Sequence, residues 1–252
     1  MKLFIAIDDT DNRESIGTGR LSRMLAESLT KNGFLQAGRV TRHQLLVHPA
    51  IPYTSHNSSA CIDAVVKESS LDDIADFSRS FLRNHFHEGA NPGLCICRQE
   101  TVPRELPIFG ARAQREVIDL DEAKLLAGNL DCLIWWDGPT GQGCIGAMSA
   151  VGLRSTNNDG SYIGLDGIRE IGGIKTVGEI LNMTAIDRIC DLDGHELPHG
   201  EMVDTQDWVR PILKKGRVVL ELIRINGHWR ASHQKKAKRD KNKCASPVDA
   251  LK

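Results

Sequence analysis

The sequence predicts an α/β protein with mixed α+β layers, in which helices pack on a mixed sheet. Short apolar runs alternate along the chain with amphipathic segments of helical period. Hydrophobic residues make up 40% of the sequence and aromatic residues only 5%, so the core must consist mainly of aliphatic side chains. The 252 residues are enough for one large domain, or for one domain that carries a smaller lobe.

In the first half of the chain, apolar periodicity separates the strands from the helices. The helix expected near the N-terminus has a core-facing stripe of Leu21, Leu25 and Leu29, and Gly33 is well placed to end it. Two prolines keep the segment 50–54 extended. The expected strands are 3–7, 40–47, 59–66 and 94–97, and the expected helices are 18–31 and 70–85.

In the second half, the apolar periodicity is weaker, and turn residues and helix caps mark where elements begin and end. A helix is expected over 121–129, and residues 133–136 either extend it or form a strand. A glycine-rich loop over 138–143 precedes an apolar helix over 144–153. Thr176 and Glu179 form a capping box that opens a further helix. Asn226-Gly227 joins two apolar runs, 218–225 and 228–231, which predicts a β-hairpin.

Charge and composition set the expected organisation. The net charge is −1, which gives no global attraction to nucleic acid, but the stretch from Arg230 to Lys243 is basic with a single acid, Asp240. We expect residues 1–231 to form a single domain, with 171–231 as its C-terminal lobe, and 232–252 to be a disordered basic tail. The sequence has no signal peptide, no membrane-length apolar run and no CxxC pair, so we expect a cytoplasmic protein with reduced cysteines and no membrane partner.

An acidic run directly follows the first expected strand. It consists of Asp8, Asp9, Thr10 and Asp11. Clustered carboxylates repel one another, and burying them unpaired costs several kcal/mol each, so a cation is the natural partner. Hard oxygen ligands favour Mg²⁺. The alternative is a solvated acidic turn in which Asp11 or Thr18 caps the following helix.

Two other segments could take part in a site. The glycine loop Gly141 to Gly146 could bind a phosphate through backbone N–H groups at a helix N-terminus, but it lacks the Walker ending and could equally be a tight structural loop. The extended segment with Tyr53, Thr54 and His56 either lines a substrate groove or is a structural crossover. Asp137 and Asp166 are further acids near expected loops, and His195 and His199 are either metal ligands or surface-loop histidines.

Four motifs in order resemble the N-terminal kinase-like catalytic domain of the archaeal tRNA agmatidine synthetase family. The first is the acidic run with Gly17-Thr18, and the second is His48-Pro49-Ala50-Ile51-Pro52-Tyr53. The third is the turn Asn91-Pro92-Gly93, and the fourth is the loop and helix from Gly141 through Ala147. The resemblance covers about residues 1–170, with a fainter echo near Asp207-Trp208 and 218–225.

The resemblance implies a nucleotide site and its cofactors. Family enzymes use ATP and Mg²⁺ to activate a tRNA cytidine for attack by agmatine, and the threonine after their acidic run is phosphorylated. By this likeness Asp8, Asp9 and Asp11 would hold metal and act in catalysis together with Thr18. The nucleotide would be bound by residues of the same motifs: Thr10, Gly17, Asn91, Gly141, Gly143 and Gly146.

This sequence also departs from the family. Basic residues after the Pro-Tyr pair are replaced by Thr54, Ser55 and His56, and the basic flank of the glycine loop becomes Pro139-Thr140 and Gln142. No OB-fold or zinc ribbon is expected. Three functions follow: an ATP- and Mg²⁺-dependent phosphotransfer or ligase-type enzyme with a different or smaller substrate than tRNA, a tRNA-modifying enzyme that grips RNA with its basic tail, and a non-catalytic nucleotide-binding protein. The second substrate and the oligomeric state are open.

Overall fold

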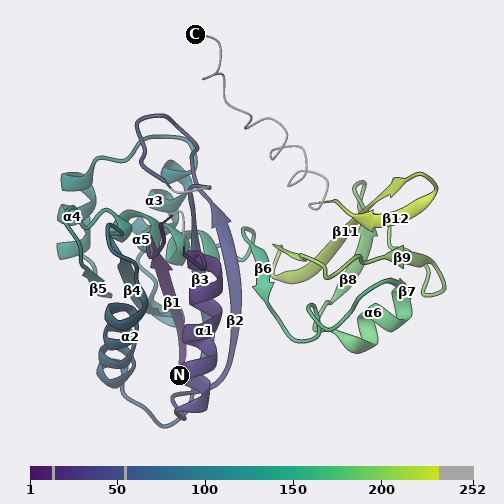
Figure 1. Cartoon of the computed structure of the whole chain (residues 1–252), viewed down its shortest axis with the longest axis horizontal. Helices are drawn as coiled ribbons and strands as arrows, with labels where there is room; N and C mark the ends of the chain where they lie inside the picture. The colour runs from purple at the N-terminus through teal and green to yellow at the C-terminus, as the bar shows by residue number, and fades with distance from the viewer. Residues whose placement is uncertain (13–14, 54–55, 233–252) are drawn as a thin grey trace. The chain divides into compact units, whose positions relative to one another are not determined.

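The structure, a computed structural model, describes residues 1–12, 15–53 and 56–232 (Figure 1). The chain divides into two compact units, which we describe separately: unit 1 is Met1–Gly164, and unit 2 begins at Leu165. Both combine strands with helices, so the mixed α/β class is confirmed. A single domain over 1–231 stays a prediction. Thr54 and the tail from residue 233 lie outside the described residues.

Unit 1 is built on a six-stranded sheet with the order β5-β4-β1-β3-β2-β6. Each neighbouring pair in it is antiparallel. The strands are β1 (Lys2–Asp8), β2 (Leu35–Gln44), β3 (Ser58–Val66), β4 (Gly93–Arg98), β5 (Leu133–Trp136) and β6 (Ser161–Gly164).

Helices cover both faces of this sheet (Figure 1). They are α1 (Thr18–Lys31), α2 (Leu71–His85), α3 (Glu105–Ala113), α4 (Leu120–Gly128) and α5 (Gly143–Ser155), with a 3₁₀ turn, η1 (Gln99–Thr101). Strand β1 sets the division, because its side chains alternate between the faces. Phe4 and Ala6 belong to a core with α3, α4 and α5. The other face of the sheet packs against α1, which also contacts α2.

Helix α5 is the centre of unit 1, and it is buried nearly all round. Its sequence is therefore apolar and small on every side instead of striped. A Cβ on Gly152 would lie 1.9 Å from the carbonyl oxygen of Leu106, and one on Gly110 of α3 would lie 2.8 Å from that of Ser149. These glycines let the two helix backbones approach closely, and α5 also packs against β1 and β4.

Most of the local expectations are confirmed, with two corrections in unit 1. Of the two alternatives expected for residues 133–136, the structure has the strand, β5. The strand expected at 40–47 runs from Leu35 to Gln44, because its ladder with β3 starts earlier and the chain leaves the sheet after Gln44. Helix α3 and strand β6 were not expected at all. Gly33 follows α1 with φ +83°, the left-handed conformation that ends helices.

Unit 2 is a smaller, strand-rich layer. It contains β7 (Ile174–Thr176), α6 (Val177–Met183), β8 (Arg188–Asp191), β9 (Met202–Asp204), β10 (Ile212–Lys214), β11 (Arg217–Ile225) and β12 (His228–Ala231). Strand β8 pairs parallel with β11 and β9 with β12, whereas the other pairs are antiparallel. The predicted hairpin is present, with Asn226 and Gly227 both at positive φ, and the predicted capping box opens α6.

Candidate functional site

The antiparallel sheet of unit 1 brings the acidic run and the glycine loop together. Asp8 at the end of β1 pairs in register with Gly93 at the start of β4, and Gly93 pairs with Trp136 at the end of β5. Helix α5 begins seven residues later, at Gly143. The carboxyl ends of β1 and β5, the start of β4 and the start of α5 therefore share one edge of the sheet.

Three glycines make this meeting close enough for side chains to touch. A Cβ on Gly146 would lie 1.7 Å from Oδ2 of Asp8, so the Asp8 carboxylate rests on the backbone of the first turn of α5. A Cβ on Gly143 would lie 2.3 Å from the Asn91 carbonyl oxygen, and one on Gly93 would lie 2.1 Å from that of Gly143. Any larger residue at these positions would push α5 away from the ends of β1 and β4.

The environment of Asp8 disfavours its charged form. Desolvation raises the pKa of the Asp8 carboxyl to about 8, and the neighbouring charges of Asp9 and Asp11 act in the same direction. Desolvation also raises the pKa of Asp9, again with a contribution from Asp11. A bound cation would reverse this cost, because it would favour the charged form of each carboxylate. The donor set of three clustered carboxylates fits a hard divalent ion.

Asp9 is linked to the glycine loop by a network of amides. Its backbone adopts φ +49°, and its carbonyl oxygen accepts the Asn91 N–H at 3.1 Å. Its side-chain Oδ2 accepts a hydrogen bond from Nε2 of Gln142 at 2.9 Å. Oδ1 of Asn91 in turn accepts the N–H of Thr140 at 2.8 Å and its hydroxyl at 2.9 Å. Asp9 is thus joined to the glycine loop at two points, directly at Gln142 and through Asn91 at Thr140.

Thr10, Thr18 and Asp11 form a short chain of hydrogen bonds at the start of α1. The Thr10 hydroxyl donates to Oγ1 of Thr18 at 3.0 Å, and the Thr18 hydroxyl donates to Oδ1 of Asp11 at 3.1 Å. Both threonines are buried. The N-cap of α1 is Gly17, with φ +82° and no side-chain cap, so the alternative of an Asp11 or Thr18 helix cap is wrong. The Thr18 hydroxyl instead faces the acidic run.

The amides at the start of α5 are already occupied. The N–H of Gly143 donates to the Asn91 carbonyl at 3.0 Å, that of Cys144 to the Gly141 carbonyl at 3.2 Å and that of Ile145 to the Gln142 carbonyl at 3.0 Å. Phosphate binding by these three N–H groups would need the loop to rearrange. Gly141 has φ +73°, and a Cβ on it would lie 2.3 Å from the Trp136 ring, so this glycine is needed for the shape of the loop.

Several residues singled out in the sequence lie outside this cluster. Tyr53 and His56 are exposed on the loop between β2 and β3. Asp137 lies 3.7 Å from Arg83 of α2 in an exposed ion pair. Asp166 is in unit 2 and is exposed. These positions keep their sequence-based roles only as predictions.

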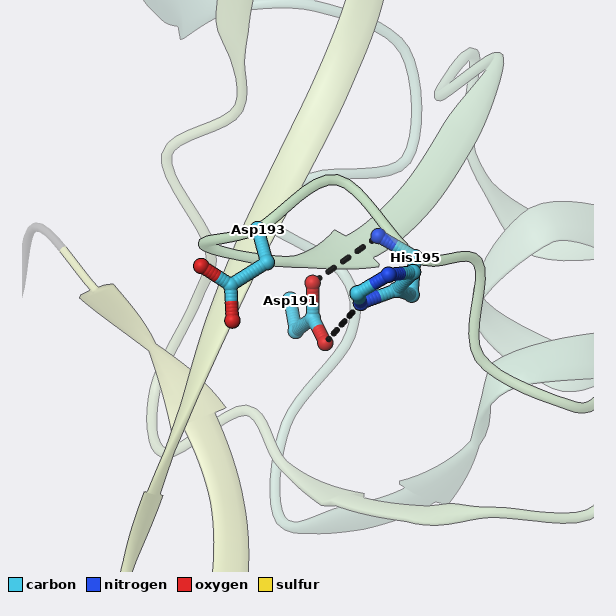
Figure 2. Close-up of side chains that lie close together, drawn as sticks. All are labelled: Asp191, Asp193 and His195. Carbon is cyan, nitrogen blue, oxygen red and sulfur yellow. Dashed lines mark hydrogen bonds and ion pairs between the residues drawn. The ribbon is translucent and has the colours of Figure 1, made fainter.

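His195 lies in a small acidic cluster of unit 2, which Figure 2 shows. It faces Asp191 and Asp193 across the turn that follows β8. Its Nδ1 is 3.1 Å from Oδ2 of Asp191, and its backbone N–H donates to Oδ1 of the same residue at 2.9 Å. These bonds close a tight turn and lower the pKa of Asp191, the backbone bond contributing most. His199 is not part of the cluster.

Sequence reasoning missed two participants of the site, Gln142 and Thr140. In the sequence, Gln142 stands out only because it replaces a basic residue of the family. Its side-chain amide can donate a hydrogen bond to a carboxylate, and this chemistry is the signal that could have linked it to the acidic run. Thr140 had no local signal at all, because its partner Asn91 is 49 residues away in the chain.

Comparisons with known proteins agree with the motif-based resemblance. No protein-family model matches the chain. The tRNA 2-agmatinylcytidine synthetase TiaS of Pyrococcus horikoshii, whose name specifies an isoleucine tRNA, is 29% identical over 162 residues, which are 62% of this chain and 37% of that protein. The corresponding protein of Methanosarcina acetivorans is also 29% identical, over 60% of this chain and 35% of its own length.

Solved structures give the same result. The crystal structure of a tRNA fluorescent labeling enzyme has a TM-score of 0.53 and 26% identity, covering 60% of this chain and 36% of that one. The complex of TiaS with its isoleucine tRNA and ATP has a TM-score of 0.52 and 25% identity over the same shares. About 60% of this chain is therefore similar to part of the agmatidine synthetases, and the chain spans little more than a third of their length.

No helix in the described part of the chain is long and apolar enough to cross a bilayer.

Proposed function

We propose that unit 1 binds ATP with Mg²⁺ and catalyses a phosphotransfer or ligase-type reaction related to that of the agmatidine synthetases. One observation carries the proposal: the Asp8 carboxylate packs on Gly146, so two motifs separated by more than 130 residues form one site. A solvated acidic turn or an isolated structural loop would not require this contact. The similar proteins are named as tRNA-modifying synthetases, and one of them is described in complex with ATP.

Asp8, Asp9 and Asp11 are the residues that would hold the ion. Bound Mg²⁺ would neutralise phosphate oxygens and draw the ATP phosphates to this edge of the sheet. The raised pKa of Asp8 supports this assignment, because crowded carboxylates that are costly to ionise alone are good ligands for a cation. Gln142 and Asn91 would fix the orientation of Asp9 and of the loop.

Thr18 has the geometry of an acceptor hydroxyl. Its proton already points to a carboxylate, Oδ1 of Asp11, at 3.1 Å. In the proposed transfer, Oγ1 of Thr18 attacks the γ-phosphorus of ATP, the bond to the β-phosphate oxygen breaks, ADP leaves, and the hydroxyl proton passes to Asp11. Thr10 donates to the same oxygen and would hold it in place.

The direct test is the Asp8→Asn, Asp9→Asn double variant. We expect its affinity for Mg-ATP, measured by isothermal titration calorimetry, to fall by about tenfold or more, because removing metal ligands costs at least as much as removing the residues that orient them. Asp166→Asn, an exposed acid in unit 2, is the matched control and should bind as the wild type does. Unchanged Mg-ATP affinity in the double variant would falsify the proposed site.

Two candidate functions differ in their second substrate, which is tRNA in one and a smaller molecule in the other. The names of the similar proteins favour tRNA, because they are those of tRNA-modifying synthetases. The neutral residues Ser55 and His56 in place of basic ones favour a smaller or less anionic substrate. Of these two, we propose the enzyme with the smaller substrate.

A third candidate is a non-catalytic nucleotide-binding protein. Such a protein would bind ATP but show no turnover with any member of a panel of amines and nucleosides.

A further inference from the structure

Unit 1 brings three cysteines together where β5 begins. Cys95 and Cys97 are two residues apart on β4, so their side chains lie on the same face of the sheet, and both are buried in the core that includes α5. Cys132 directly precedes β5 and packs against the same core. Of the six cysteines in the described part of the chain, Cys132 is the one that is partly exposed. A small molecule in solution can therefore reach this group of thiols through Cys132.

The register of the sheet places Cys97 opposite Cys132. Ile96 pairs with Leu133 in the antiparallel ladder of β4 and β5, and the next position in the same register joins Cys97 to Cys132. Directly opposed residues on antiparallel strands have Cα atoms about 4.5–5.5 Å apart. This separation lies within the range of roughly 4.4–6.8 Å that a disulfide spans. The backbone therefore holds these two residues at a distance that suits a covalent bond between them.

The side chains of this opposed pair are already in contact. The Cys132 thiol donates a hydrogen bond to Sγ of Cys97, and the two sulfur atoms are 2.7 Å apart. Cys95 also shares a hydrogen bond with Cys132, but in the ladder Cys95 lies opposite Ile134. Cys97 and Cys132 can thus be joined without a change of register.

Both thiols of the pair hold their protons at neutral pH. The hydrogen bond from Cys132, together with burial, raises the pKa of Cys97 well above its usual range. The pKa of Cys132 is raised to about 12, first by hydrogen bonding with Cys95 and then by burial, while the bond with Cys97 opposes the rise. Because the thiolate is the reactive form, the pair should react slowly near pH 7 and faster in alkaline buffer. The contact between the sulfur atoms, and not a low pKa, favours their bonding.

We propose that Cys97 and Cys132 form a redox site of unit 1, which exchanges with small-molecule disulfides to give a reversible cross-strand disulfide. The thiolate of Cys132 attacks one sulfur of the small disulfide, whose S–S bond breaks, so that one small thiol leaves and Cys132 carries a mixed disulfide. The sulfur of Cys97 then attacks the Cys132 sulfur, the second small thiol leaves, and the bond between the two cysteines forms. The protein loses two electrons and two protons, and the small disulfide takes up both to become two thiols.

The bond ties an edge strand to the sheet. Strand β5 has four residues, lies at the end of the strand order and pairs with β4. A disulfide at its start closes the segment from Cys97 to Cys132, which contains α3 and α4, and thereby restricts the unfolded chain. Oxidation should raise the urea concentration at the midpoint of unfolding, and dithiothreitol should reverse the rise. The redox site does not depend on the proposed function of unit 1, because it shares no residue with the acidic site.

A peptide map of the wild-type chain tests the site without any variant. The full chain is equilibrated with oxidised and reduced glutathione in alkaline buffer, quenched with acid, alkylated and digested without reduction. Mass spectrometry should find the peptides of Cys97 and Cys132 joined, with the loss of two hydrogen atoms. Glutathione adducts alone, a link from Cys132 to another cysteine such as Cys244, or full alkylation of both residues would overturn the site.

Variants identify the attacking thiol and separate the bond from the fold. Cys95→Ser should still form the disulfide, and Cys190→Ser, which removes a buried thiol of unit 2, is the matched control. The double variant Cys95→Ser, Cys97→Ser leaves Cys132 without a thiol partner and should accumulate its mixed disulfide with glutathione. The shift of the urea midpoint on oxidation should vanish in Cys132→Ser. An equal shift in a folded Cys132→Ser chain would contradict the proposal.

Discussion

Gly146 and Asp8 occupy adjoining positions that leave no room for a methyl group. A Cβ on Gly146 would lie 1.7 Å from Oδ2 of Asp8 and 2.9 Å from its Cβ, so rotating the short side chain only partly relieves the overlap. Glycine inside a helix is normally about 1 kcal/mol worse than alanine, so its presence here has a structural cause. The cause is the carboxylate that rests against it.

We expect Gly146→Ala to lower the free energy of unfolding by about 1–3 kcal/mol, the usual cost of overpacking, and to weaken Mg-ATP binding by turning Asp8 away. Urea denaturation and calorimetry measure the two effects. Gly128→Ala at the end of α4 is the control: nothing lies within 4 Å of its added Cβ, so the change should be neutral or stabilising. A Gly146→Ala chain as stable as the wild type would show that α5 and β1 are further apart than described.

His43 joins three elements into a buried polar network beside the core. The ring lies on β2, with Nδ1 2.7 Å from Oδ1 of Asp159 in the loop before β6 and Nε2 2.9 Å from the Thr41 hydroxyl. Gln114, just after α3, donates to the other oxygen of Asp159 at 3.0 Å. The Thr41 hydroxyl also lies 3.3 Å from the Cys61 carbonyl oxygen, to which it donates, so the network extends to β3.

This network predicts a pH dependence of stability. Desolvation lowers the pKa of His43 in the folded protein, and the bond to Asp159 opposes it only in part. The unfolded chain takes up a proton near pH 6.5 while the folded chain does not, so stability is present above that pH and is lost as the pH falls below it. The expected loss is at most about 1.4 kcal/mol per pH unit.

Urea denaturation between pH 7 and pH 5 tests this expectation. The slope should shrink in His43→Gln, which keeps a polar side chain but has no imidazole. His228→Gln removes an exposed histidine of the β11–β12 hairpin and should leave the slope unchanged. An equal slope in wild type and His43→Gln would contradict the assignment.

At the scale of elements, local signals explain which predictions succeeded. The boundaries of α1 and of the β11–β12 hairpin follow from apolar spacing, a C-terminal glycine and an Asn-Gly turn, all of which act over a few residues. Helix α3, in contrast, has little in its own sequence that predicts a helix. It contains Pro107 and Gly110 and has no side-chain N-cap, so it has no strong local signal. Its close packing on α5 stabilises it instead, and that contact is invisible in the sequence.

Across the whole molecule, charge is separated along the chain. Residues 233–252 carry seven basic and two acidic side chains, which leaves 25 basic and 31 acidic ones in residues 1–232, a net charge of −6. This net charge opposes the approach of a polyanion, whereas the net charge of +5 on the terminal segment favours it. A tRNA substrate would therefore be bound largely through residues 233–252.

A chain that lacks residues 233–252 tests whether the second substrate is tRNA or a smaller molecule. Mg-ATP affinity should be unchanged, because all the proposed ligands lie in unit 1. If the full chain binds tRNA, the truncated chain should bind it more weakly at low salt and with a shallower dependence on salt concentration, since fewer counterions are released. Filter binding over a range of salt concentrations measures this. No tRNA binding by the full chain at low salt would eliminate tRNA and leave the smaller substrate.

The sequence by itself determined the acidic run, the glycine loop, the order of motifs and the mixed α/β class, because each depends on residue types within short windows. Only the tertiary structure decided that Asp8 rests on Gly146, that Gln142 holds Asp9 and that Thr18 faces Asp11 instead of capping α1. These contacts depend on antiparallel register and on the close approach of α5 to β1. In a hairpin such as β11–β12 the turn fixes the register, but β1, β3 and β4 are joined by long connections, and their register depends on which faces the assembled sheet buries.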